Sequence, residues 1–69
     1  MYEGYVESYN AQKGYGYLVI ENDPSKEKIF IHQSALERLN IPSLIVGQRV
    51  LFEVAPGRKG PQAVALQLM

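Results

Sequence analysis

Short runs of β-favouring residues, each closed by turn-forming residues, constrain this chain more than any other feature of its sequence. The runs cover residues 2–9, 15–20, 28–32, 48–54 and 63–68. Asparagine, proline and glycine separate them, most clearly in the segments 22–25 and 56–61, which we expect to be turns or loops. Five short strands with almost no helix predict a small closed or partly open all-β barrel, because closure removes exposed sheet edges.

A single short helix is expected between the third and fourth strands. Ser34 with Glu37 three residues later is typical of a capping box. We therefore expect a helical turn over residues 35–39 that ends before Pro42. No stretch of the chain has the composition of a linker or an internal repeat, so residues 1–69 are expected to form one domain.

Charge and residue usage narrow the classes of function. Seven lysines and arginines balance seven acidic residues, so the formal net charge is zero, unlike that of a strongly basic nucleic-acid binder. With no cysteine and one histidine, we expect no metal, no cofactor and no enzyme activity, since a nucleophile with its base is also lacking. No apolar run approaches the roughly 20 residues that span a bilayer, so we expect a cytoplasmic protein without a membrane partner.

Aromatic residues concentrate in the first part of the chain. All five tyrosines and Phe30 lie within the first thirty positions, and only Phe52 lies outside them. In the run Lys13-Gly14-Tyr15-Gly16-Tyr17, strand alternation puts both phenol rings on one face, and Gly16 leaves the opposite face without a side chain. Two neighbouring rings form a platform on which unpaired bases can stack. The plainer interpretation is that both tyrosines are half-buried strand residues.

The next strand repeats this pattern. Phe30 and His32 alternate with Ile29 and Ile31, so the ring side chains share the face opposite to the two isoleucines. Antiparallel pairing would then place Phe30 and His32 beside the two tyrosines. A lone histidine is more often an ordinary surface residue, so His32 gains its interest from these neighbours.

These residues resemble the motifs of the bacterial cold shock proteins, and the resemblance runs along the full chain. Residues 13–17 look like the family's first ribonucleoprotein motif, usually K-G-F-G-F, and residues 29–32 look like its second, usually V-F-V-H-F. The resemblance implies a five-stranded antiparallel barrel of the oligonucleotide-binding (OB) type with one short helical turn. It further implies a protein that binds single-stranded RNA or DNA and acts as an RNA chaperone, without a cofactor or catalysis.

The resemblance also implies which residues contact nucleic acid. The stacking positions are Tyr9, Tyr15, Tyr17, Phe30 and His32. Lys13 and Lys59 are candidates for contact with phosphates, and Lys28 and Arg58 are further cations that would add to them, unless all of these are ordinary solvated loop charges. Gln33 stands where the family usually has phenylalanine, and we include it as a residue that would hydrogen-bond a base.

Several positions depart from the family pattern in the direction of weaker binding. Glu7 and Ser8 replace a lysine and an exposed tryptophan, Gln33 replaces a phenylalanine, and Ile41 replaces a loop aromatic. Each lost ring removes about 1–3 kcal/mol of stacking per base. We therefore expect a lower affinity than that of a typical family member, partly offset by Lys28, which stands where the family often has aspartate.

An alternative function follows from the apolar pair Ile45 and Val46, where the family usually has acidic residues. In this alternative the barrel keeps the cold shock fold but has weak or lost nucleic-acid binding. It would then contact a protein partner or a second copy of itself through Tyr5, Ile41, Ile45 and Val46. The plainer interpretation is that the pair packs under a neighbouring loop.

Overall fold

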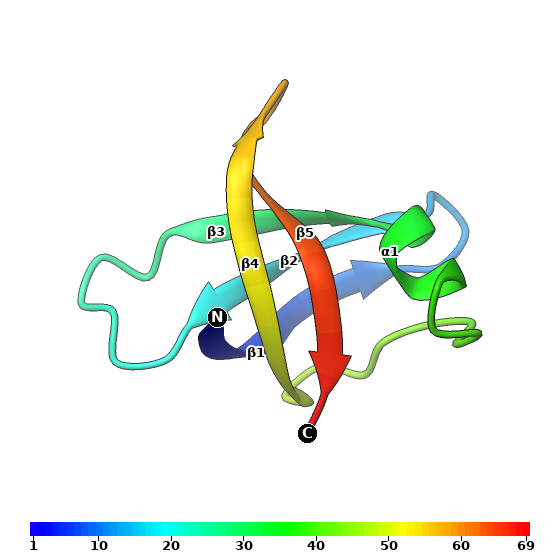
Figure 1. The fold of residues 1–69 in the computed structure, drawn as a ribbon, viewed down its shortest axis with the longest axis horizontal. Helices are drawn as coiled ribbons and strands as arrows, with labels where there is room; N and C mark the ends of the chain where they lie inside the picture. Colours follow the sequence, from blue (N-terminus) through cyan, green and yellow to red (C-terminus); the bar gives the residue numbers. More distant parts are fainter.

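In a computed structural model that describes residues 1–69, strands occupy each of the five predicted runs. They are β1 (Tyr2–Asn10), β2 (Tyr15–Ile20), β3 (Lys28–His32), β4 (Arg49–Gly57) and β5 (Gly60–Leu68). The strands close into a barrel in the order β1-β2-β3-β5-β4, which confirms the predicted OB-type barrel. In Figure 1, β4 and β5 cross in front of the sheet that β1, β2 and β3 form.

One strand pair differs from the antiparallel expectation. β3 and β5 run parallel and meet at the pair Phe30 and Gln62, whereas the other four pairs are antiparallel. The reason is geometric, because strand directions cannot alternate all the way around a closed ring with an odd number of strands. One parallel seam is therefore required, and it lies at β3 and β5, beside the helix that follows β3.

The barrel interior is filled by the inward positions of the strands. Ile29 and Ile31 are 1% and 0% exposed, while Lys28 and His32 on the opposite face of β3 are exposed, as the alternation predicted. Leu36 from the helix closes one end of the same core. The residues with no exposed surface are Val6, Leu18, Ile31, Val50 and Phe52.

The helix begins earlier than the sequence predicted, and a different residue caps it. Helix α1 spans Gln33–Glu37, and its N-cap is His32, whose ring Nδ1 accepts a hydrogen bond from the Ser34 amide at 3.1 Å. The expected capping box of Ser34 and Glu37 is therefore wrong. Because β3 runs directly into α1, the last strand residue is already in the N-cap position.

The segment 56–61 is a strand hairpin, where the sequence predicted an irregular turn or loop. Pro56 pairs with Pro61 and Gly57 with Gly60, so only Arg58 and Lys59 form the turn. Gly60 has a φ of +104°, a backbone conformation that residues other than glycine rarely adopt. The paired glycines thus extend the ladder to the tip, which projects beyond the barrel in Figure 1.

A bulge in β1 decides which of its side chains face outward. Val6 pairs with Leu18 and Ser8 with Tyr17, so Glu7 is one extra residue between two consecutive pairs. The bulge shifts the alternation of β1 by one position. Ser8 therefore faces the same side as Tyr17, and Tyr9 faces the opposite side with Gly16.

Candidate nucleic-acid interface

The outer face of β1, β2 and β3 carries five of the predicted site residues in rows that run across the strands. Residues paired directly across a ladder point to the same face, so the register defines these rows. They are Tyr5-Val19-Lys28, then Ser8-Tyr17-Phe30, then Asn10-Tyr15-His32. The prediction that Tyr15, Tyr17, Phe30 and His32 share one face is confirmed by this register, and we call these four residues the aromatic face.

Three rings of the aromatic face are in mutual contact. Tyr15 and Phe30 stack with ring centroids 5.6 Å apart and an interplanar angle of 28°. Tyr17 meets Phe30 edge to face at 5.9 Å and Tyr15 at 6.2 Å. All three are partly exposed, so each has ring surface in contact with solvent. The cluster is a partly exposed aromatic surface whose rings are held in place by contact with one another.

Lys59 lies over this cluster. Its Nζ is 5.1 Å from the centroid of Tyr15 and 5.3 Å from that of Phe30, which is cation–π geometry. A hollow beside these rings is lined by both turn residues of the hairpin, Arg58 and Lys59, together with Phe30, His32, Ser34 and Gln62. The hairpin thus brings two cations, forty positions or more from Tyr15, to the edge of the aromatic face.

His32 is fixed at the end of β3 by its capping role. Nδ1 accepts from the Ser34 amide, so in the neutral imidazole the proton is on Nε2. The residue is exposed and pairs with Tyr15. The ring is therefore held at the border of the aromatic face with one N–H available as a donor.

Lys13 and Gln33 lie together at the β1–β2 turn. The Lys13 amide donates to Asn10 Oδ1 at 3.0 Å, which orders the turn and leaves the lysine side chain exposed. The Gln33 amide donates to the Gly14 carbonyl at 2.8 Å, and its side chain lies against Gly14, where a β-carbon would meet it at 2.6 Å. Gly14 also has a φ of +76°, so both the backbone conformation and the lack of space for a β-carbon favour glycine at this position.

Lys28 does not lie free on this face. Its Nζ forms an ion pair with Glu7 at 3.2 Å. A side-chain hydrogen bond from Lys28, then one from Ser8, hold the pKa of the Glu7 carboxyl below its ordinary value. The two charges therefore compensate each other beside Tyr17, and the role of Lys28 as a phosphate contact stays a prediction.

Tyr9 lies apart from the aromatic face. It pairs with Gly16, on the side of the sheet opposite to Tyr15 and Tyr17, and it packs against the hydrophobic core. A β-carbon at Gly16 would lie 2.8 Å from the Tyr9 ring, so the glycine leaves room for that ring. Burial, followed by the charge of Glu37, raises the pKa of the Tyr9 hydroxyl. Tyr9 thus lies on the side of the sheet opposite to the aromatic face, and its assigned role as a stacking residue stays a prediction.

The apolar pair of the alternative function is on the surface. Ile45 and Val46 are 74% and 68% exposed, at a turn that Gly47 completes by donating to the Val6 carbonyl at 2.8 Å. Ile41 instead packs against the core. Ile41 is therefore less exposed than the other two residues, and contact of this turn with a protein partner or a second copy stays a prediction.

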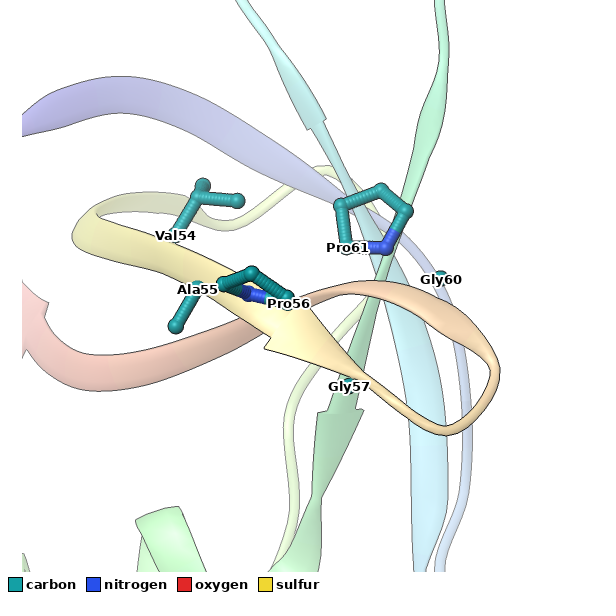
Figure 2. A pocket seen from close by; sticks show the side chains of 6 residues that line it. All are labelled: Val54, Ala55, Pro56, Gly57, Gly60 and Pro61. Carbon is teal, nitrogen blue, oxygen red and sulfur yellow. The ribbon is translucent and has the colours of Figure 1, made fainter.

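Two features near the site had no signal in the sequence. Gln62 lies next to Phe30 only because of the parallel seam, which depends on how the barrel closes. A second, apolar hollow lies on the β4–β5 hairpin, where Figure 2 shows Val54 and Pro61 pointing to the same side and Ala55 to the other. The prolines at 56 and 61 favoured a loop in the sequence analysis, so the paired strands that form this hollow were not predicted.

Two further observations concern other kinds of site. The structure contains no group of three or more histidine, cysteine, aspartate or glutamate residues arranged to hold a metal ion. None of its helices has the length and apolar character needed to cross a membrane.

The fold and the site define a class, namely small OB-type barrels with an aromatic outer sheet face. The family model described as the "Cold-shock" DNA-binding domain matches residues 2–69, and the chain belongs to this family. It is 41% identical over 64 residues to the major cold shock protein of Streptococcus pyogenes serotype M6, which covers 93% of this chain and 91% of that protein. Cold shock protein CspA of Staphylococcus epidermidis is also 41% identical, over 63 residues and 91% of each chain.

Proposed function

We propose that this protein binds single-stranded RNA or DNA on the aromatic face and acts as an RNA chaperone. The observation that carries the proposal is the cluster of Tyr15, Tyr17 and Phe30, three contacting rings that are partly exposed on one sheet face. Stacking of bases on such rings tolerates any base sequence and contributes about 1–3 kcal/mol per base. Membership of a family described as DNA-binding supports the binding of nucleic acid by this chain.

Selectivity for single strands follows from the chemistry of stacking. The rings of the aromatic face stack on the flat surface of a base, and that surface is covered in a duplex. Lys59 and Arg58 at the hairpin, with Lys13 at the β1–β2 turn, are the cations that would meet phosphates at two borders of the face. Each phosphate contact adds a salt-dependent contribution to affinity.

Chaperone activity needs no chemical step in this proposal. A protein that binds the unpaired strand and not the hairpin shifts the equilibrium toward the unpaired strand by mass action. The shift grows with protein concentration and requires neither a nucleotide cofactor nor catalysis by the chain. A non-enzymatic protein is therefore sufficient for the proposed role.

The test is a fluorescence anisotropy titration of a labelled pyrimidine-rich single strand at 50 and 200 mM salt, beside a duplex of the same sequence. We expect saturable binding to the single strand, weaker at the higher salt, and little binding to the duplex. The double variant Tyr15→Ala/Phe30→Ala should lower affinity by roughly 30-fold or more, since two stacking contacts are lost.

A matched control is Tyr2→Ala, because Tyr2 is an exposed β1 tyrosine that pairs with the inward residue Phe52, on the face of β1 opposite to the aromatic face. It should bind as the unaltered protein does. Unchanged affinity of the double variant, with the fold intact by circular dichroism, contradicts the assignment of this surface. Chaperone activity is measured as the opening of an RNA hairpin that carries a fluorophore and a quencher. The unaltered protein and Tyr2→Ala should open this hairpin, and the double variant should not.

A further inference from the structure

The outer sheet face continues beyond the aromatic face by one row, and this row contains a tyrosine. Tyr5 on β1, Val19 on β2 and Lys28 on β3 are direct cross-strand neighbours. The row lies two residues along β2 from Tyr17, a distance of about 7 Å along the strand. Tyr5 thus brings an aromatic ring to the β1 side of the same face, one row away from the ring-free position Ser8.

Tyr5 forms one wall of a hollow at this end of the sheet. Val19, only 4% exposed although it points outward, and Ile20 contribute its apolar surface. The β2–β3 loop contributes the other wall with Asn22, Pro24 and Lys26. In Figure 1 this loop lies at the end of the β1–β3 sheet opposite to α1.

The loop wall of the hollow is held by its own hydrogen bonds. Asp23 accepts from the Ser25 amide at 3.1 Å and from the Ser25 hydroxyl at 2.9 Å, and its carbonyl accepts from the Lys26 amide at 3.1 Å. Lys26 has a φ of +51° and Asn22 a φ of +64°, so both adopt a left-handed conformation that defines the loop shape. The hollow is therefore formed before any ligand arrives.

The charges around the hollow leave one cation without an ion-pair partner. Lys26 makes no ion pair, the Asp23 carboxylate is engaged by Ser25, and Lys28 is paired with Glu7. Glu21 at the start of the loop is paired with Arg49. An approaching phosphate would thus meet Lys26 as the free positive charge, while Asp23 keeps the electrostatic attraction modest.

We propose that Tyr5 and the β2–β3 loop form an additional nucleobase subsite, where one unpaired base stacks on Tyr5 and a phosphate of the strand lies near Lys26. The inference rests on the proposed function, since the strand would reach this subsite from the aromatic face across Lys28 and Glu7. It assigns to Tyr5 part of the stacking that Ser8 does not provide. The ligand is a base of any type, because no base-specific donor is required.

The experiment measures how affinity depends on oligonucleotide length. Oligothymidylates of four to nine nucleotides are titrated by anisotropy against the unaltered chain, Tyr5→Ala, Tyr5→Leu and Tyr5→Phe. We expect Tyr5→Ala and Tyr5→Leu to lose roughly 5- to 150-fold in affinity for the longer strands and to reach their plateau one nucleotide earlier. Tyr5→Phe should behave as the unaltered chain does, because it keeps the ring.

Controls separate loss of the subsite from loss of the fold. Thermal unfolding by circular dichroism is recorded for each variant, and Tyr5→Leu keeps apolar volume in the hollow if Tyr5→Ala destabilises the barrel. Tyr2→Ala removes a tyrosine from the same strand outside the hollow and should leave the length dependence unchanged. Lys26→Ala should reduce the salt dependence for long strands and not for the shortest ones.

The two proposals fail in different ways. If the unaltered chain binds and Tyr15→Ala/Phe30→Ala does not, but folded Tyr5→Leu keeps the full affinity and plateau length, the Tyr5 subsite is wrong and the proposed function stands. If the unaltered chain binds no strand of any length at low salt, the proposed function is wrong and the subsite is wrong with it.

Discussion

The outer face of the β1–β3 sheet has two unequal halves. On β2 and β3 the outward positions next to the hairpin carry rings, with Tyr15 and Tyr17 packed around Phe30. On β1 the corresponding positions carry Ser8 and Asn10, and the bulge residue Glu7 precedes Ser8. The paired strands extend across both halves, with one bulge at Glu7, so the fold supports a wider aromatic surface than this chain uses.

The difference teaches that the barrel and the binding surface are specified by separate sets of residues. Inward residues such as Val6 and Leu18 are paired across β1 and β2 and fully buried, so they belong to the barrel core and not to the outer face. The outward residues can then change without loss of the barrel. Affinity for a strand should therefore be adjustable at β1 over a wide range while stability stays nearly constant.

The largest expected effect comes from adding the missing ring. In Ser8→Trp the indole would lie beside Tyr17, because the two residues are a direct cross-strand pair. One additional stacking contact should strengthen binding of a long single strand by roughly 5- to 150-fold, measured by anisotropy at fixed salt. Ser8→Leu is the control for added apolar surface, and equal gains in both variants would argue against stacking.

A smaller effect is expected from reversing the charge at the bulge. In Glu7→Lys the ion pair with Lys28 is lost and two cations border the aromatic face. Two added phosphate contacts steepen the salt dependence by a slope of about 1.4, so the gain in affinity should shrink roughly sevenfold between 50 and 200 mM salt.

The control for overall charge is Glu53→Lys, which makes the same change at an exposed position on β4. It alters the net charge equally but adds no cation next to the aromatic face. Identical salt slopes for the two variants would mean that net charge, and not the position of Glu7, governs binding.

The smallest effect concerns Tyr9, which the bulge turns away from the aromatic face. Burial and Glu37 raise its pKa, so the native state holds the phenol proton more tightly than the unfolded chain. The contribution of Tyr9 to the free energy of unfolding is then fully present below the ordinary tyrosine pKa of about 10. It is lost as pH rises through the higher pKa of the folded state. Urea midpoints between pH 8 and 11 should fall more steeply for the unaltered chain than for Tyr9→Phe. Parallel curves would contradict this assignment.

Local patterns predicted the strands and most of the aromatic face. Period-two alternation placed Ile29 and Ile31 inside and Phe30 outside, and the structure agrees because β3 is regular along its length. The same rule applied to β1 would put Tyr5, Glu7 and Tyr9 on one face. One inserted residue reverses that order at Tyr9, and nothing in the local sequence marks the bulge.

Contacts that depend on how the barrel closes could not be predicted from local sequence patterns. The position of Lys59 over Tyr15 results from the hairpin, the parallel seam and the barrel together. The pairing of Lys28 with Glu7 requires that β1 and β3 flank the same strand, so that these two side chains meet across β2. Contacts between distant segments are set by topology, which residue spacing along the chain does not determine.

In the free protein, the ammonium of Lys59 occupies the ring surface of Tyr15 and Phe30 on which a base would stack. A base that stacks on these rings must exchange with the cation that already covers them, and the measured affinity is then the difference between two occupants of one surface. The displaced ammonium is released beside the incoming strand, where it can pair with a phosphate. Replacing Lys59 therefore removes a competitor and an attraction at once, and these two effects oppose each other.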